Sequence, residues 1–409
     1  MTRSLDRPAA PRLAIPERAR PREVPGWWLA LLAAPLATGS NSLALVLPRV
    51  AGDLGAGVGT ATWLVTTFGW AVAIGTPLMA GLVRRRGLRV TLLFGALLVT
   101  AGALLAGLAA TLPLLLLGRA FQAIGGAGLV TVAMNLAGST RRMGLITASF
   151  GACGAVGPLA GSLVADAASW HLSLALSAVS LLAVPAVTRF LPAAIPGKPV
   201  GRFDSSGALL LVALASALVF VPRFPPAAAA AVLAAALLAF RIRARPDGFV
   251  PASVVREPAF LLAAGIACAL STSYFALLYA APALMKHDLG WTTGQVGVAQ
   301  LVALLAGSGL SLGLSAISAR MSRPVLLTVL IGLGALAALI AATGPWPFLL
   351  LAVPALAVFA ASAGQATLAV SATAAVPGEH RPTAIGLFNL CYQLGGAFGP
   401  AIAALLALG

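Results

Sequence analysis

The sequence predicts an all-α protein that crosses a membrane many times. Of its 409 residues, 60% are hydrophobic and only 9% are charged, and runs of about 20 apolar residues recur along the chain. Each run is long enough to cross a bilayer core of about 30 Å as a helix. A soluble domain would need long polar stretches, and only residues 1–26 supply one.

The hydrophobic pattern predicts thirteen spans, in a group of six, a short pair and a group of five. The two pieces of the pair have about 15 residues each and are separated by PRFPP at 222–226. They are either two tight spans or a hairpin that barely reaches the far side of the bilayer. The predicted spans are 27–47, 60–83, 90–110, 113–138, 144–166, 171–190, 207–221, 226–240, 259–285, 295–318, 325–342, 347–370 and 383–408.

These spans divide the chain into four parts. A disordered basic tail rich in Pro and Arg occupies 1–26, and a six-helix bundle follows at 27–190. Cytoplasmic connectors and the short hairpin occupy 191–258, and a five-span bundle occupies 259–409. The tail is not a cleavable signal, because the apolar run after it has full span length and lacks a cleavage site of small residues.

The net charge of +16 reflects membrane topology and does not indicate a nucleic-acid partner. With the amino terminus in the cytoplasm, 22 of the 26 Lys and Arg residues fall on the cytoplasmic side. Arg49, Arg223 and Lys286 fall outside, and Arg119 alone is embedded in a span. A bias this steep follows the positive-inside rule. We therefore expect a multi-pass protein of the cell inner (plasma) membrane.

No catalytic or metal site is predicted. The three cysteines are scattered through separate spans, without the spacing of a disulfide framework or a metal site. No nucleotide-binding loop follows a strand, so an ATP-driven pump is excluded unless a partner supplies the ATPase. We expect no enzyme activity, no cofactor and no metal.

Two stretches 242 residues apart resemble each other, which predicts two repeated halves. If 383–408 repeats the fifth span, a helix matching 171–190 should follow it, so we expect either that this last helix is absent or that the sequence is truncated. The matching positions are Gly144, Gly154, Gly157 and Pro158 in the first stretch and Gly386, Gly396, Gly399 and Pro400 in the second.

Four motifs, the last of them made of two separate segments, occur in order along the chain. AGLVRRRGLR (80–89) follows the second span, RAFQAIGGA (119–127) lies in the fourth, and GLITASFGACGAVGPLAGS (144–162) lies in the fifth. FDSSG (203–207) and REPAF (256–260) flank the central hairpin. Together they resemble the drug-efflux branch of the major facilitator superfamily, the drug:H⁺ antiporters with fourteen spans. The resemblance covers the chain after residue 26 and implies alternating access between two halves.

The resemblance also implies a gating role for two motifs and shows departures from the family pattern. In exporters of this family the fifth helix is thought to seal against the other half, which favours export over uptake. Arg84 and Gly39 stand where the family has acids, and Cys153 where a glycine is usual. The gating residues it implies are Gly154, Gly157, Pro158, Gly161, Arg84 and Arg85.

All ten acids lie outside the predicted spans. Proton-coupled transporters usually place carboxylates or histidines within the membrane, where they titrate as the gate moves. Asp166, at the outer end of the fifth span, is the best remaining candidate for proton coupling, and the alternative for such an acid is simple solvation.

Arg119 lies about 9 Å below the outer interface and needs acceptors at that depth. Backbone carbonyls, Gln122, water or an anionic ligand could supply them, so the residue either pins helix packing or responds to substrate. Uncharged polar and aromatic side chains could line a central cavity, although Trp70 could equally serve packing. The predicted substrate-binding residues are Asn41, Trp70, Arg119, Gln122, Tyr274, Gln300, Asn389 and Gln393.

The sequence thus favours a secondary active exporter of small amphipathic or hydrophobic compounds, such as drugs or natural products. A cavity without fixed negative charge suits neutral or anionic molecules better than cations. Its expected partners are the substrate, the lipid bilayer and, where transport is coupled, protons; we expect a monomer. The alternatives are a passive facilitator of a neutral or anionic small molecule and a non-transporting membrane scaffold or sensor.

Overall fold

The computed structural model describes residues 23–138, 140–191, 204–343, 347–374, 376–377 and 380–406. Most of the predicted tail and most of the connector that begins at 191 lie outside these residues. Every regular element in the described ranges is a helix, which confirms the predicted fold class. Nine of those helices are long and apolar enough to cross a membrane, and each of the thirteen predicted spans falls on helical structure.

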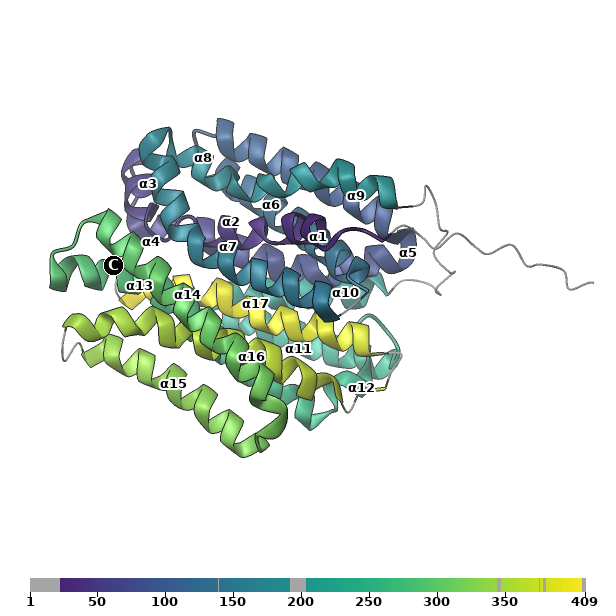
Figure 1. Cartoon of the computed structure of the whole chain (residues 1–409). Helices are drawn as coiled ribbons and strands as arrows, with labels where there is room; N and C mark the ends of the chain where they lie inside the picture. The colour runs from purple at the N-terminus through teal and green to yellow at the C-terminus, as the bar shows by residue number, and fades with distance from the viewer. Residues whose placement is uncertain are drawn as a thin grey trace, which may run out of the picture.

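Two bundles lie side by side in Figure 1, the helices up to α9 above and α13 to α17 below. The first half contains α1 (Gly26–Ala33), α2 (Pro35–Asn41), α3 (Leu47–Asp53), α4 (Val58–Ala61), α5 (Trp63–Leu108), α6 (Leu112–Leu136), α7 (Thr140–Ala167), α8 (Trp170–Leu174), the 3₁₀ helix η1 (Ala175–Ala183) and α9 (Val184–Phe190).

The hairpin and the second half complete the chain. They contain α10 (Ser205–Phe220), α11 (Ala227–Ala244), α12 (Ala252–Val255), α13 (Pro258–Leu289), α14 (Thr293–Ile317), the 3₁₀ helix η2 (Ser318–Arg320), α15 (Arg323–Thr343), the 3₁₀ helix η3 (Pro347–Leu351), α16 (Ala352–Ala374) and α17 (Arg381–Leu406).

The first predicted span is interrupted twice. The α1 helix gives way to α2 at Pro35, which has no backbone N–H to continue the hydrogen-bond ladder. Residues 42–46 then form turns before α3 begins, with the Ser42 amide donating to the Thr38 carbonyl at 2.9 Å. This irregular backbone lies beside the contact between the two halves, as described below.

The second and third predicted spans are both contained in α5. Gly87 has a φ of 85° and a ψ of 172°, so the element is two helices that meet at this residue. A positive φ at this reversal suits glycine, which has no Cβ to clash. The second part of α5 packs closely on α6, where Gly102 faces the backbone of Gly118 and Gln122.

The contacts of the two halves repeat, in agreement with the sequence repeat. In the first half α7 packs on α2, and in the second half α17 packs on α13. Each of these helices also crosses to the other half, α7 onto α14 and α17 onto α5. Gly157 contacts Asn41 in α2, and its counterpart Gly399 contacts Phe275 in α13.

At one point the two halves meet backbone against backbone. A Cβ placed on Gly69 of α5 would lie 2.6 Å from the carbonyl carbon of Gly396 in α17. Only glycines allow two helices to approach this closely, as small residues do in membrane bundles.

The hairpin of α10 and α11 is fixed at one end by Asp204. This carboxylate caps α10 by accepting from the Gly207 amide at 3.0 Å, and it pairs with Arg241 of α11 at 2.7 Å. It also accepts from the amide of Phe249 at 3.1 Å. Burial alone would raise the pKa of Asp204, but the hydrogen bonds from Phe249, Arg241 and Gly207 outweigh burial and hold the pKa below its ordinary value.

The tip of the hairpin is fixed at the other end of the molecule. Arg223 donates to the Thr62 hydroxyl, and its guanidinium lies 4.9 Å from the centre of the Trp63 ring. Because α5 begins at Trp63 and Asp204 lies near the far end of its first part, the hairpin runs the length of the bundle. Of the two pieces, α11 with 18 residues is long and apolar enough to cross a membrane, whereas α10 with 16 residues is a shorter apolar helix.

We expect Asp204→Asn to lower the free energy of unfolding by about 2 kcal/mol, because hydrogen bonds to a charged group contribute about 1.5–3 kcal/mol. A carboxylate whose pKa is lowered by folding stabilises the folded state above its unfolded pKa of about 3.9. That contribution is lost as the pH falls through the lower, folded pKa. Thermal unfolding of the purified protein, followed from neutral pH to about pH 3, measures both effects.

The control for this experiment is Asp247→Asn, which alters an exposed carboxylate of the same connector. The wild type should lose stability on acidification more steeply than Asp204→Asn, whereas Asp247→Asn should follow the wild type. Equal acid sensitivity of wild type and Asp204→Asn would contradict the assignment.

Candidate functional site

Polar and aromatic side chains gather where the two halves meet, and we call this set the interhalf cluster: Asn41, Arg119, Tyr274, Tyr279 and Tyr392. All three tyrosines of the chain belong to it. All five side chains are buried, with at most 7% of their surface exposed. Tyr274 lies within electrostatic range of both Tyr279 and Tyr392, and Tyr279 lies within range of Arg119.

Arg119, in α6, is fully buried and bound to the protein itself. Its guanidinium donates to the carbonyl of Gly39 at 2.9 Å and to that of Leu64 at 3.4 Å. It also donates to Gln122 Oε1 at 3.2 Å and lies 4.0 Å from the centre of the Phe68 ring. Of the two roles predicted for Arg119, these contacts match the one that pins helix packing.

Two side-chain hydrogen bonds cross from one half to the other within this cluster. Asn41 of α2 donates to the Gly154 carbonyl at 2.9 Å and approaches the Tyr274 hydroxyl of α13 at 3.4 Å. The Tyr279 hydroxyl of α13 donates to the Ser40 carbonyl at 3.0 Å. The second bond ends beside the carbonyl that Arg119 holds, so adjacent α2 carbonyls are bound from opposite halves.

The predicted amides of the second half lie deeper in that half. Gln300 is buried and donates to the Leu278 carbonyl at 2.9 Å. Asn389 accepts from Gln365 at 3.5 Å, and Gln393 is half-buried one turn further along α17. Of the predicted binding residues, the structure thus brings Asn41, Arg119, Gln122 and Tyr274 together at the interface.

The structure places Trp70 away from the interhalf cluster. Its indole N–H donates to the hydroxyl of Ser216 in α10 at 3.0 Å, so the ring packs against the hairpin. Of the two roles predicted for Trp70, stacking on a flat ligand and packing, this hydrogen bond matches the packing role.

Two comparisons with known proteins bear on this arrangement. A model of the Major Facilitator Superfamily matches residues 28–261 and 261–409, almost the whole chain. The chain belongs to the major facilitator superfamily. Its fold agrees: a crystal structure of a peptide transporter in complex with sulfate superposes with a TM-score of 0.66 at 14% identity, covering 94% of this chain and 89% of that one.

Curated relatives of this major facilitator protein are drug- and antibiotic-resistance proteins, which confirms the resemblance to the drug-efflux branch. The lincomycin resistance protein of Streptomyces lincolnensis is 33% identical over 64% of this chain and 58% of the relative. The chloramphenicol resistance protein of Streptomyces lividans is 30% identical over 47% of this chain and 50% of the relative. Multidrug resistance protein 3 of Bacillus subtilis is 29% identical over 32% of this chain and 26% of the relative. The matched segments thus span between about a quarter and three fifths of these relatives.

Three glycines of the fifth-span motif of this superfamily member face its own half. A Cβ on Gly154 would meet Asn41 of α2 at 3.6 Å, and one on Gly157 would meet it at 2.9 Å. Gly161 is closer still, with the Ser42 carbonyl oxygen 2.0 Å from an added Cβ. Pro158 is buried beside them in α7. Other residues of this helix face α14 of the other half, among them Gly151 opposite Ser308 and Leu159 opposite Gly297.

The second gating motif lies at the interface between α5 and α17. Arg84 lines a small cavity of about 60 Å³ together with Pro77, Phe249 and Gly386. Arg85 follows in α5 and is half-buried. We call this region, with Arg241, the arginine-rich end of the molecule.

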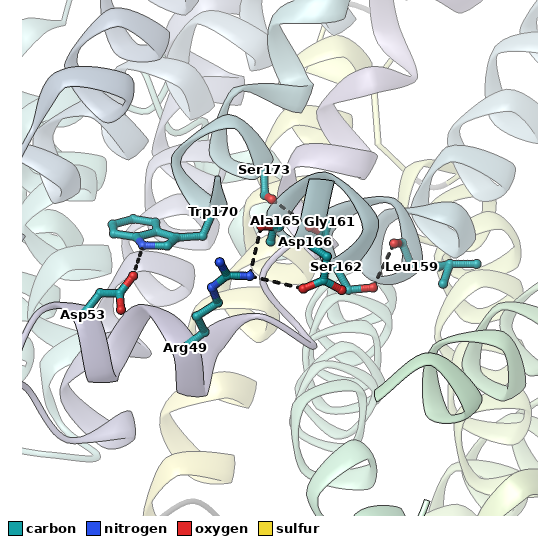
Figure 2. A network of polar contacts seen from close by, with 9 residues as sticks. All are labelled: Arg49, Asp53, Leu159, Gly161, Ser162, Ala165, Asp166, Trp170 and Ser173. Atoms are coloured by element: carbon teal, nitrogen blue, oxygen red, sulfur yellow. Dashed lines mark hydrogen bonds and ion pairs between the residues drawn. The ribbon is translucent and has the colours of Figure 1, made fainter. Parts of the chain in front are cut away.

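Asp166 lies at the opposite end, in the network of Figure 2. Arg49 of α3 donates to the Ala165 carbonyl at 2.9 Å and pairs with the Asp166 carboxylate at 3.1 Å. Trp170 donates to Asp53 at 2.6 Å beside this pair. The Asp166 side chain is 74% exposed, so it sits on the surface and joins α3 to α7.

Sequence reasoning missed the carbonyl of Ser40 and the ring of Phe68, and it left Tyr279 out of the predicted binding residues although it placed that tyrosine among the side chains that could line a cavity. No residue pattern predicts which backbone carbonyl will accept a hydrogen bond from a distant side chain, and Phe68 cannot be told from the other apolar residues of its span. Tyr279 had a usable signal, since all the tyrosines of the chain lie in spans and would be costly against lipid.

Proposed function

We propose that this chain exports small amphipathic or hydrophobic compounds by alternating access between its two halves. The observation that carries the proposal is the interhalf cluster, where buried polar groups of α2 and α13 bond across the interface. Two hydrogen bonds, one of them long, are few enough to break and reform as the halves separate. In this proposal the arginine-rich end faces the cytoplasm, on the same side as the amino terminus. The protein acts as a monomer in the cell inner membrane.

The chemistry of the cluster favours neutral or anionic substrates. Three tyrosine rings and an asparagine amide offer flat apolar surface and uncharged hydrogen-bonding groups. The relatives named for resistance to lincomycin, chloramphenicol and multiple drugs support small organic compounds as the class. Cationic dyes are expected to be poor substrates, because the described carboxylates lie outside the cluster.

One observation favours the passive facilitator as the second candidate. Within the described ranges, the one buried carboxylate is Asp204, and its hydrogen bonds hold the hairpin. If transport is instead coupled to protons, the group that binds the proton must lie at the surface. We propose that this group is Asp166, which is paired with Arg49. Protonation of Asp166 would release Arg49 and loosen α3 from α7.

The test is efflux of neutral, anionic and cationic fluorescent compounds from cells without their own pumps, each with and without a protonophore. The export proposal predicts that neutral and anionic compounds leave faster than from empty-vector cells, and that the protonophore stops this. Asp166→Asn should then abolish the protonophore-sensitive part, and Asp247→Asn, an exposed acid of the connector, should not.

Other outcomes select the alternatives. Equilibration that runs only down the gradient, with or without the protonophore, would make the chain a facilitator. Preferred export of cationic dyes would contradict the substrate class. Absence of flux for every compound, with the protein present in the membrane, would select the scaffold or sensor.

A further inference from the structure

A cavity of about 370 Å³ opens at the end of the molecule opposite the arginine-rich end, between the first half and α13. Its volume is within the range of about 300–1,000 Å³ that small organic ligands occupy. One wall is apolar and comes from the turns before α3 and from α3 itself, including Leu45, Leu47 and Pro48. The other wall is α13, with Pro282 and Tyr279.

The cavity and the interhalf cluster share Tyr279. Its ring lines the cavity, while its hydroxyl donates to the Ser40 carbonyl. A molecule in the cavity therefore contacts Tyr279, which forms one of the two hydrogen bonds that join the halves. This continuity is the reason to treat the cavity as part of the transport route.

The charged group at the cavity is Lys286, two helical turns beyond Tyr279 on α13. Within the described part of the chain Lys286 makes no ion pair, and no carboxylate lines the cavity. The neighbouring His287 also lines it but bonds Asp288 through Nδ1 at 2.7 Å. Asp288 does not line the cavity and its carboxylate is bound to His287, so the lysine ammonium is the charged group on the cavity wall.

We propose that this cavity binds amphipathic organic anions, with the ligand carboxylate or sulfonate on Lys286 and its apolar body against Leu45, Leu47 and Pro48. The proposal rests on the proposed function and makes its substrate class more specific. An uncharged ligand of the same shape gains the apolar contacts and lacks the charged one. A cation of that shape meets the ammonium on the cavity wall, where the adjacent Asp288 carboxylate is already bound to His287.

The chain offers an unusually clean test, because its lysines are Lys198 and Lys286 alone. The full-length protein would be placed in nanodiscs of neutral phosphatidylcholine and titrated with dansyl-leucine, an aromatic carboxylate, and with its uncharged methyl ester. The comparison uses Lys286→Gln, Lys286→Arg and the matched control Lys198→Gln.

The anion should bind at least roughly tenfold more weakly to Lys286→Gln than to wild type, since a hydrogen bond to a charged group contributes about 1.5–3 kcal/mol. Lys286→Arg and Lys198→Gln should bind like wild type, and the ester should bind all four proteins with similar, weaker affinity. In Lys198→Gln, dansyl-leucine should also slow modification of Lys286 by an amine-reactive reagent, quantified by mass spectrometry.

Equal binding of acid and ester, or anion binding that Lys286→Gln leaves unchanged, would overturn the inference. Its fate is separate from that of the export proposal. Lysine-dependent binding in a chain that moves nothing in cells would keep the site and refute export. Efflux of organic anions that is indifferent to Lys286→Gln would keep export and refute the site.

Discussion

Arg119→Met is expected to lower the free energy of unfolding by about 2–4 kcal/mol, because it removes the charged donor of the Gly39 and Leu64 carbonyls and leaves Gly39 with the weaker bond from the Ser42 hydroxyl. The stability of Arg119→Lys should lie between those of the wild type and Arg119→Met, since a single ammonium cannot reproduce the guanidinium fork that binds three acceptors at once. Thermal unfolding of the purified protein in detergent measures both variants.

The matched control is Arg49→Met. Arg49 also donates to a backbone carbonyl and pairs with an acid, but its side chain is 49% exposed, so its loss should cost less than about 1 kcal/mol. Should both variants melt at the same temperature, the packing role of Arg119 is wrong. In the folded fraction of Arg119→Lys, the substrate affinity should stay within about twofold of wild type, because the guanidinium is bound to the protein rather than to a ligand.

Gly161→Ala is expected to be the most damaging single-methyl change in α7. The added Cβ would lie 2.0 Å from the Ser42 carbonyl oxygen, and that atom belongs to backbone that cannot turn away. We expect a cost of about 3 kcal/mol or more, at or above the upper end for overpacked cores, together with loss of efflux. The melting temperature and the amount of folded protein recovered from membranes provide the measurement.

Gly154→Ala provides the comparison on the same helix face. Its added Cβ would meet Asn41 Nδ2 at 3.6 Å, an ordinary van der Waals distance, so stability should change little. Similar losses in the two variants would mean that the motif tolerates no methyl group for reasons other than the contact with α2.

The sequence was most informative where a single physical rule applied over many residues. Span positions follow from hydrophobic length, and both the internal repeat and the four motifs pointed to the two-half fold. Arg119 stood out for the same reason, since a lone cation in an apolar run is costly. Its partners could not be predicted, because the Gly39 carbonyl becomes its acceptor only once α2 and α6 have packed.

The sequence was least informative where a partner lies far away along the chain. It left Trp70 between a ligand cavity and packing, and the structure shows it bonded to Ser216, which lies 146 residues further on in α10. Helical periodicity shows which residues share a face and says nothing of what covers it. The glycines of the fifth-span motif were predicted to allow close packing, but only the structure shows that Gly154, Gly157 and Gly161 pack against Asn41 and Ser42, whereas Gly151 lies opposite α14.

The meeting of Gly69 with Gly396 has a mechanical consequence. A contact made by two bare backbones has no rotamers to rearrange and no interlocking side chains to lift over one another, so one helix can roll on the other there at small cost. Such a point acts as a fulcrum. In the proposed cycle, the resistance to rocking would then come from the bonds away from it, Tyr279 to Ser40 at the cluster and the contacts around Arg84 at the arginine-rich end. A methyl group at Gly69 or Gly396 would hinder the rocking motion in both directions. A change at either of the other contacts would instead shift the equilibrium between the two conformations of the cycle.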